Sequence, residues 1–274
     1  MKIGLVPMSA KPYHAGHHML VELAAISEIT DELKELELPV NDKVLVFLSY
    51  SSRGTKKVKD PTDKRTLKQG GRKIEIPRPG EAPVFGSDMR HIWTHLLKPN
   101  LQVSDKVDFV SPDEGGHAAP VRNVHIVCDA LKKAHDLGEE TFNIPYTGIV
   151  ANTQNTIINI YSDSEDIINN YSNEEMNRIY GDLWGSQIKG VGIPRSSTVN
   201  ISGTKMRQYL CDGNLEEFVS LLPPLPEDVK MEIASILSQS ISCGYPLSRR
   251  KETNESIILY KVYQQLLNEI KNTF

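Results

Sequence analysis

Two histidines and a lysine near the start of the chain form a cluster of residue types that bind phosphate. His14 and His17 flank Ala15 and Gly16, and Lys11 lies three residues before His14. At the start of a helix, the two imidazoles would lie beside free N–H groups and a dipole that favours an anion. Gly16 leaves room for close approach of the backbone. The cluster therefore predicts a site for a polyphosphate.

A second segment with the same chemistry lies late in the chain, at residues 200–207, where the sequence reads Asn-Ile-Ser-Gly-Thr-Lys-Met-Arg. Ser202 is suited to cap a helix, and Thr204 falls in the first turn of that helix. Hydroxyl and free N–H groups at this place can hold phosphate oxygens. Lys205 and Arg207 add positive charge in the first turns. Taken alone, the segment is also typical of an ordinary capped surface helix.

The order of strands and helices predicts how the two segments are positioned. Short apolar runs indicate strands, and apolar residues at helical spacing indicate helices. We expect strands at residues 3–6, 43–50, 106–110, 156–161 and 188–193. We expect helices at residues 17–33, 88–97, 119–137, 163–171 and 202–211. This alternation predicts an α/β fold, a doubly wound parallel sheet (Rossmann-like), with ligands at the carboxyl ends of its strands.

The chain is expected to form one α/β domain over residues 1–222 and a C-terminal helical segment over residues 223–274. Two helices, at residues 227–238 and 255–271, make up that segment. Residues 51–83 are polar and rich in breaks, which predicts a flexible basic loop insertion. A solvated loop, a lid over a polyphosphate and a contact for an acidic partner all fit this loop. Its cations include Arg53, Lys56, Lys57, Lys59, Lys64, Arg65, Lys68, Arg72 and Lys73.

Together, the two segments resemble the signature of the nucleotidyltransferase superfamily, which has HxGH near the N-terminus and an ISSTxxR-like segment before a late helix. Here the segments read HAGH and ISGTKMR. The chain looks most similar to the archaeal-type nicotinamide mononucleotide adenylyltransferases. Those enzymes carry Gly-Arg-Phe-Gln-Pro before the first motif, where this chain has Met-Ser-Ala-Lys-Pro at residues 8–12. The resemblance covers about residues 1–210.

The resemblance implies transfer of AMP from ATP to a phosphorylated acceptor, expected to be nicotinamide mononucleotide, with release of pyrophosphate. His14, His17, Lys11 and Arg207 are the expected catalytic residues. The expected cofactor is Mg²⁺, carried with ATP through phosphate oxygens and water, so no metal ligand is expected from the protein. The loop at residues 113–122 is expected to lie near the acceptor. The residues expected to bind the nucleotide are Leu5, Val6, Pro7, Met8, Gly16, Ser202, Gly203, Thr204 and Lys205.

Three other functions fit parts of the sequence. The first is a cytidylyltransferase acting on a phospho-alcohol; its usual Arg-Thr-Glu-Gly run is matched only in part by Pro-Arg-Ser-Ser-Thr at residues 194–198. The second is a non-catalytic nucleotide-binding or assembly protein on the same fold, because a fold alone does not specify an activity. The third is zinc binding by His14, His17 and His18, which lacks a nearby carboxylate or thiolate ligand.

Charge, hydropathy and cysteine content narrow the classes of partner and compartment. The net charge of −4 gives no global basic field, so we expect no nucleic acid as partner. No apolar run reaches the ~20 residues that a membrane helix needs, and the first residues are not typical of a signal peptide. Cys128, Cys211 and Cys243 are widely spaced, which predicts reduced thiols. We expect a cytoplasmic protein and, because oligomers are common in the resembled superfamily, a homo-oligomer.

Overall fold

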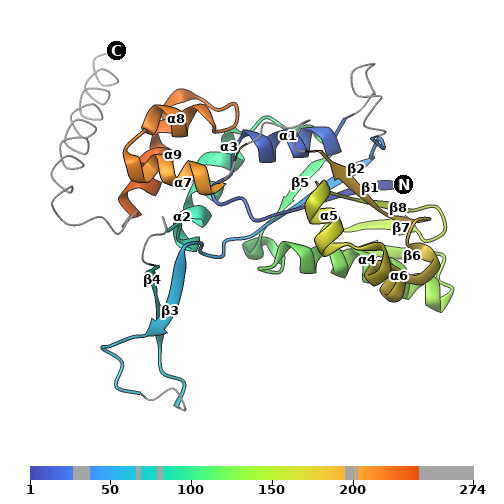
Figure 1. Ribbon diagram of the computed structural model, residues 1–274. Helices are drawn as coiled ribbons and strands as arrows, with labels where there is room; N and C mark the ends of the chain where they lie inside the picture. Colours follow the sequence, from blue (N-terminus) through green and yellow to red (C-terminus); the bar gives the residue numbers. More distant parts are fainter. Residues whose placement is uncertain (27–37, 66–68, 79–82, 195–200, 202, 241–274) are drawn as a thin grey trace.

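A five-stranded parallel β-sheet forms the centre of the protein in this computed structural model, which describes residues 1–26, 38–65, 69–78, 83–194, 201 and 203–240 (Figure 1). The strand order is β5-β2-β1-β8-β9, and each neighbouring pair is parallel. The strands of this sheet are β1 (Lys2–Met8), β2 (Lys43–Leu48), β5 (Val107–Val110), β8 (Ile157–Asp163) and β9 (Ile188–Ile193). Because helices flank the sheet, the predicted α/β, Rossmann-like doubly wound fold is confirmed.

The central strands are apolar on both faces, because each face of the sheet is covered. In β1, Ile3 and Leu5 belong to one buried cluster, and Val6 and Met8 belong to another. Successive side chains of a strand point to opposite faces, so these two clusters are the two layers of the core. The near-continuous apolar run that predicted β2 has the same origin, since its residues are also divided between the two clusters.

Helices cover both faces of the sheet, with α1 on one side and α4 on the other in Figure 1. The amphipathic helix α4 buries Val127 and Leu131 against the face of the sheet that carries Ile3 and Leu5. The helices and helical turns are α1 (Ala15–Ala24), α2 (Gly86–His91), η3 (Ile92–Leu97), α3 (Lys98–Asn100), η4 (Pro112–Glu114), α4 (Pro120–Leu137), α5 (Ser164–Asn170), α6 (Asn173–Tyr180), η5 (Gly181–Leu183), α7 (Gly203–Asp212), α8 (Leu215–Ser220) and α9 (Glu227–Ser240).

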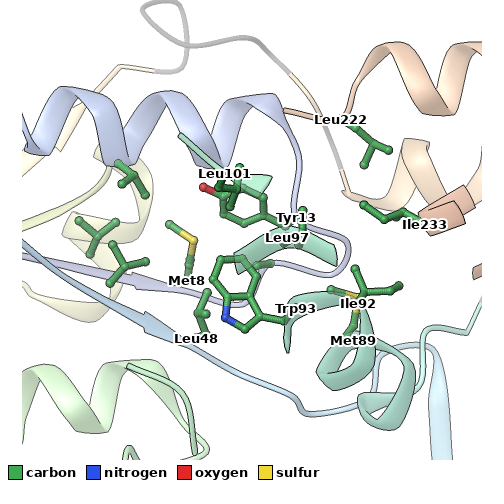
Figure 2. Close-up of a cluster of buried hydrophobic side chains, with 14 of the residues drawn as sticks. Met8, Tyr13, Leu48, Met89, Ile92, Trp93, Leu97, Leu101, Leu222 and Ile233 are labelled. Atoms are coloured by element: carbon green, nitrogen blue, oxygen red, sulfur yellow. The ribbon is translucent and has the colours of Figure 1, made fainter. Parts of the chain in front are cut away.

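The C-terminal helices pack on the same layer of the core as the loop after β1. Figure 2 shows Trp93 between Tyr13 and Leu48, with Leu222 and Ile233 at one end of the cluster. The ring centroids of Trp93 and Tyr13 lie 5.4 Å apart in an edge-to-face arrangement, which is a favourable geometry for aromatic pairs. The predicted helix at residues 227–238 is confirmed as α9, and the one predicted at residues 255–271 lies outside the described residues.

The stretch predicted as a flexible loop at residues 51–83 contains a β-hairpin, so that prediction is wrong. Strands β3 (Thr55–Lys59) and β4 (Lys73–Pro77) pair antiparallel and project away from the body of the protein (Figure 1). Alternation of apolar and polar residues is the usual strand signal, but three of the five residues of β3 are lysines. A second hairpin, β6 (Thr141–Ile144) with β7 (Ile149–Asn152), was also not predicted.

The cysteines depart from the prediction of reduced thiols. Cys128 is free and buried, whereas Cys211 is disulfide-bonded, and Cys243 lies outside the described residues. Spacing in the sequence does not report which cysteines the fold brings together. The disulfide removes the cysteine argument for a reducing compartment. Among the described helices, none has the length and apolar character needed to cross a lipid bilayer.

Candidate functional site

A cavity of about 620 Å³ opens at the carboxyl ends of the central strands. Met8 ends β1, Asp163 ends β8 and Ile193 ends β9, and all three residues line the cavity. Ligands of open α/β sheets bind at this edge, where the loops that follow the strands meet. The two segments selected from the sequence meet here as well, because the cavity is lined by residues of the loop after β1 and of α7.

His14 and His17 lie at the N-terminus of α1 and hold each other in place. The Nδ1 of His14 accepts the N–H of His17, and the Nδ1 of His17 accepts the N–H of His14, both at 3.3 Å. The rings stack with their centroids 3.7 Å apart, and Tyr13 stacks on His17 at 5.6 Å. Because each Nδ1 accepts a backbone proton, each neutral ring carries its own proton on Nε2. Both rings can therefore donate a hydrogen bond to a ligand.

Burial keeps the two imidazoles neutral in the absence of a ligand. It lowers the pKa of His14 to about 4, and burial together with His14 lowers the pKa of His17 well below its ordinary value. A bound anion would raise both pKa values, because an adjacent negative charge favours the protonated ring. The N–H of Gly16, at the same helix end, has no hydrogen-bond partner among the described residues and lines the cavity. These groups together suit phosphate oxygens.

Three cations surround the histidines: Lys11, Arg53 and Arg207 all line the cavity. Burial first, and then the positive charges of Arg53 and Arg207, lower the pKa of Lys11 to about 8. The ammonium group of Lys11 donates to the hydroxyl of Ser51. Like charges brought together in a half-buried space raise the free energy of the site until an anion enters it.

Helix α7 is fixed against the loop after β1 by Arg207. Its guanidinium donates to the backbone oxygen of Lys11 and to the hydroxyl of Thr204, each at 3.1 Å. At Gly203, an added Cβ would lie 3.1 Å from the Lys11 oxygen, so a glycine lets the helix approach this closely. Ala10, in the same loop, has φ of 41°, an uncommon conformation for a residue with a side chain and one that is found at functional sites.

The side of the cavity formed by β8 and α5 has the opposite character. Asp163 caps α5 by accepting the N–H of Asp166 at 2.9 Å, and both residues line the cavity. Tyr171 lies beside them with a buried hydroxyl that has no hydrogen-bond partner among the described residues. Following the strand order from β2 through β1 to β8, the lining changes from cations to carboxylates.

Most of the residues selected from the sequence line this cavity. Those that do are His14, His17, Lys11, Arg207, Pro7, Met8, Gly16, Gly203 and Thr204. Leu5 and Val6, whose backbone was expected beside the nucleotide, are not among the lining residues, and their side chains are buried in the core. Lys205 is exposed, lies over the ring of Tyr209 at 5.6 Å and is not among the residues that line the cavity. Ser202 lies outside the described residues.

Sequence reasoning did not place several polar residues in the cavity. Arg53 falls in the predicted basic loop, and Asp163, Asp166 and Tyr171 fall in the helix predicted at residues 163–171, to which no role in the site was given. Their position after β2 and β8 was a usable signal, since polar residues after parallel strands share one edge of the sheet. Within the described residues, no three His, Cys, Asp or Glu side chains are arranged to bind a metal ion, and His14, His17 and His18 are no exception.

A second hollow, of about 670 Å³, adjoins the base of the β3–β4 hairpin and the loop expected to contact an acceptor. It is lined by Tyr50, Arg90 and Pro112, among others. Arg90 lies over the ring of Tyr50 at 5.5 Å and pairs with Asp113 at 3.3 Å.

Comparison with known proteins adds no relative: no protein-family model and no curated protein sequence matches this chain.

Proposed function

We propose that this protein is a nucleotidyltransferase that moves AMP from ATP to a phosphorylated acceptor and releases pyrophosphate. One observation carries the proposal: the two segments whose residue types suit phosphate lie far apart in the sequence and line one cavity at the strand ends. His14 and His17 belong to the first segment, and Thr204 and Arg207 belong to the second. The surrounding cations and the N-terminus of α1 suit a triphosphate.

The charge gradient across the sheet edge orients the nucleotide. Phosphates are attracted to Lys11, Arg53 and Arg207 and repelled by Asp163 and Asp166. The ribose and base therefore extend toward β8 and α5, where carboxylates can accept hydrogen bonds from hydroxyl and amino groups. The hydroxyl of Tyr171 is a further group that a nucleoside would satisfy.

The chemistry requires position and charge more than proton transfer. A phosphate oxygen of the acceptor forms a bond to the α-phosphorus, the bond from that phosphorus to the bridging oxygen breaks, and pyrophosphate leaves. His14 and His17 donate to the triphosphate through Nε2–H, and His17 is the candidate nearest to the α-phosphate. Arg207 and Lys11 stabilise the charge that develops on the leaving group. An ionised acceptor phosphate needs no general base. Mg²⁺ would bind phosphate oxygens and water and reduce their mutual repulsion.

The sequence resemblance leads us to propose ATP as donor and nicotinamide mononucleotide as acceptor. The test is pyrophosphate release with ATP and, separately, with CTP, against a panel of phosphorylated acceptors led by nicotinamide mononucleotide. We expect release with ATP and that acceptor. Release only with CTP or only with another acceptor would keep the reaction class and replace the substrate.

A matched pair of variants ties the activity to the cavity. Arg207→Met removes a cavity cation and should abolish release, whereas Arg178→Met removes an exposed arginine of α6 that pairs with Glu175 at 3.6 Å and should leave release unchanged. Thermal unfolding of both variants separates loss of activity from loss of folding. If ATP binds but no acceptor supports release, the non-catalytic nucleotide-binding function replaces this proposal.

A further inference from the structure

The hairpin formed by β3 and β4 is an arm that stands clear of the rest of the protein (Figure 1). Its two strands pair only with each other. An isolated two-stranded hairpin is marginally stable in water, so a partner that binds the arm would also stabilise it. Five-residue strands extend about 17 Å, which is longer than the triphosphate of a single nucleotide.

The arm concentrates positive charge on a protein that is otherwise acidic. Residues 53–78 contain ten Lys and Arg against three Asp and Glu, which is a net charge of +7. Because the whole chain carries −4, the remainder of the chain carries −11. All nine described cations of the arm are exposed. The expectation that excluded nucleic acid used the net charge of the whole chain, which hides this separation of charge.

The carboxylates of the arm are already engaged. Asp63 forms a bidentate salt bridge with Arg65 at 2.9–3.1 Å. Asp60 lies 3.6 Å from Arg72, and Glu75 accepts a hydrogen bond from the hydroxyl of Ser52. Among the described residues, four lysines of the arm form no ion pair within 4.0 Å: Lys56, Lys59, Lys64 and Lys73.

Two of these lysines face each other across the hairpin. Lys59 and Lys73 are partners in the register of the antiparallel pair. Lys57 lies two residues from Lys59 on the same face, and its own register partner is Glu75, 3.9 Å away. Like charges placed directly opposite each other destabilise a hairpin. A phosphate between them would relieve that repulsion, so the pair indicates an anion rather than a role in folding.

We propose that the β3–β4 arm binds the phosphate backbone of duplex nucleic acid, with Lys59 and Lys73 as two of its phosphate contacts. A two-stranded β-ribbon fits the major groove of B-form DNA. Residues 55–77 contain no Phe, Tyr, Trp or His, so the arm has no ring for stacking on the bases of a single strand. Recognition through lysine and phosphate is independent of base sequence, and the acidic remainder of the protein directs the duplex to the arm.

The test measures binding of a fluorescent duplex of about 20 base pairs, DNA and RNA separately, by anisotropy between 50 and 200 mM NaCl. The double variant Lys59→Gln/Lys73→Gln removes two phosphate contacts. Its salt slope should be smaller by about 1.8, and its affinity should fall about 60-fold at 0.1 M salt, since each contact contributes about 0.9 to the slope. The DNA and RNA measurements identify which duplex is the ligand.

The matched control is Lys133→Gln/Lys189→Gln, which removes the same charge from exposed lysines of α4 and β9. It should keep the affinity and the salt slope of the unmodified chain. The proposal would be overturned if neither the DNA nor the RNA duplex bound at 50 mM NaCl, or if both double variants lost the same affinity. Self-association that requires the arm, without duplex binding, would assign the arm to a second copy instead. None of these outcomes depends on pyrophosphate release.

Discussion

The affinity for ATP should depend on pH through Lys11. Burial and the charges of Arg53 and Arg207 lower the pKa of Lys11 from its ordinary value to about 8. A bound phosphate favours the charged ammonium, so binding above pH 8 must first restore the proton. The phosphates of ATP do not contribute to this change, because a second phosphate pKa of about 6 leaves them ionised throughout. The affinity should therefore fall as the pH rises.

The magnitude follows from the ionised fraction of one group. With a pKa of about 8, Lys11 is mostly charged at pH 7 and mostly neutral at pH 9, so Kd should rise by at most about ten-fold between these two values. Lys11 is half-buried, and solvent screens part of the interaction, which is why ten-fold is the upper limit.

Equilibrium dialysis with ATP and Mg²⁺ at a series of pH values measures this effect. In Lys11→Arg the guanidinium stays charged over the whole range, so Kd should not change between pH 7 and 9. Lys11→Met should bind weakly at every pH. A flat profile for the unmodified chain, or the same decline in Lys11→Arg, would show that Lys11 does not contact the phosphates.

Three further substitutions test the site and the core. His17→Ala should lower kcat by about 10²–10³-fold, the effect of removing one donor to a developing charge; a folded variant with unchanged kcat would exclude the assigned role. Ile233 of α9 is 1% exposed, so Ile233→Ala should lower the free energy of unfolding, measured in urea, by about 2–5 kcal/mol. Ile168 is 69% exposed, so Ile168→Ala should change it by no more than about 0.5 kcal/mol. Gly86→Ala should lower Tm sharply, because its Cβ would lie 1.8 Å from the backbone oxygen of Tyr50; an unchanged Tm would mean that this approach is not required.

The central strands of the sheet could be predicted because nearly all of their residues are apolar. In β2, residues at alternate positions enter two different buried clusters, so an uninterrupted apolar run is the pattern that a covered parallel strand must have. The strands of the arm could not be predicted, for the opposite reason. Lys56, Lys57 and Lys59 occupy β3, and such residues carry no apolar alternation from which pairing can be read.

The sequence analysis selected one part of the lining of the candidate site and missed the part that follows β8. His14 and Arg207 belong to short segments with several polar residues at fixed spacing, and such segments are visible in a sequence. Asp163, Asp166 and Tyr171 follow β8, and they share a cavity with the loop after β1 because β8 pairs with β1. Which strands are neighbours in a sheet is not encoded by spacing along the chain. Lys205 lies outside the cavity lining that contains Thr204, because adjacent residues of a helix point in different directions.

The hydrogen bond from Arg207 to the backbone of Lys11 joins residues 196 positions apart. A ribosome-bound chain therefore has the first motif long before it has the second, and closing so large a loop is a late and entropically costly event. Nucleotide binding should become possible only after α7 has been synthesised and docked. Once formed, the complex would slow hydrogen exchange in β1 and α7 together, because a ligand held by both ends stabilises them as one unit.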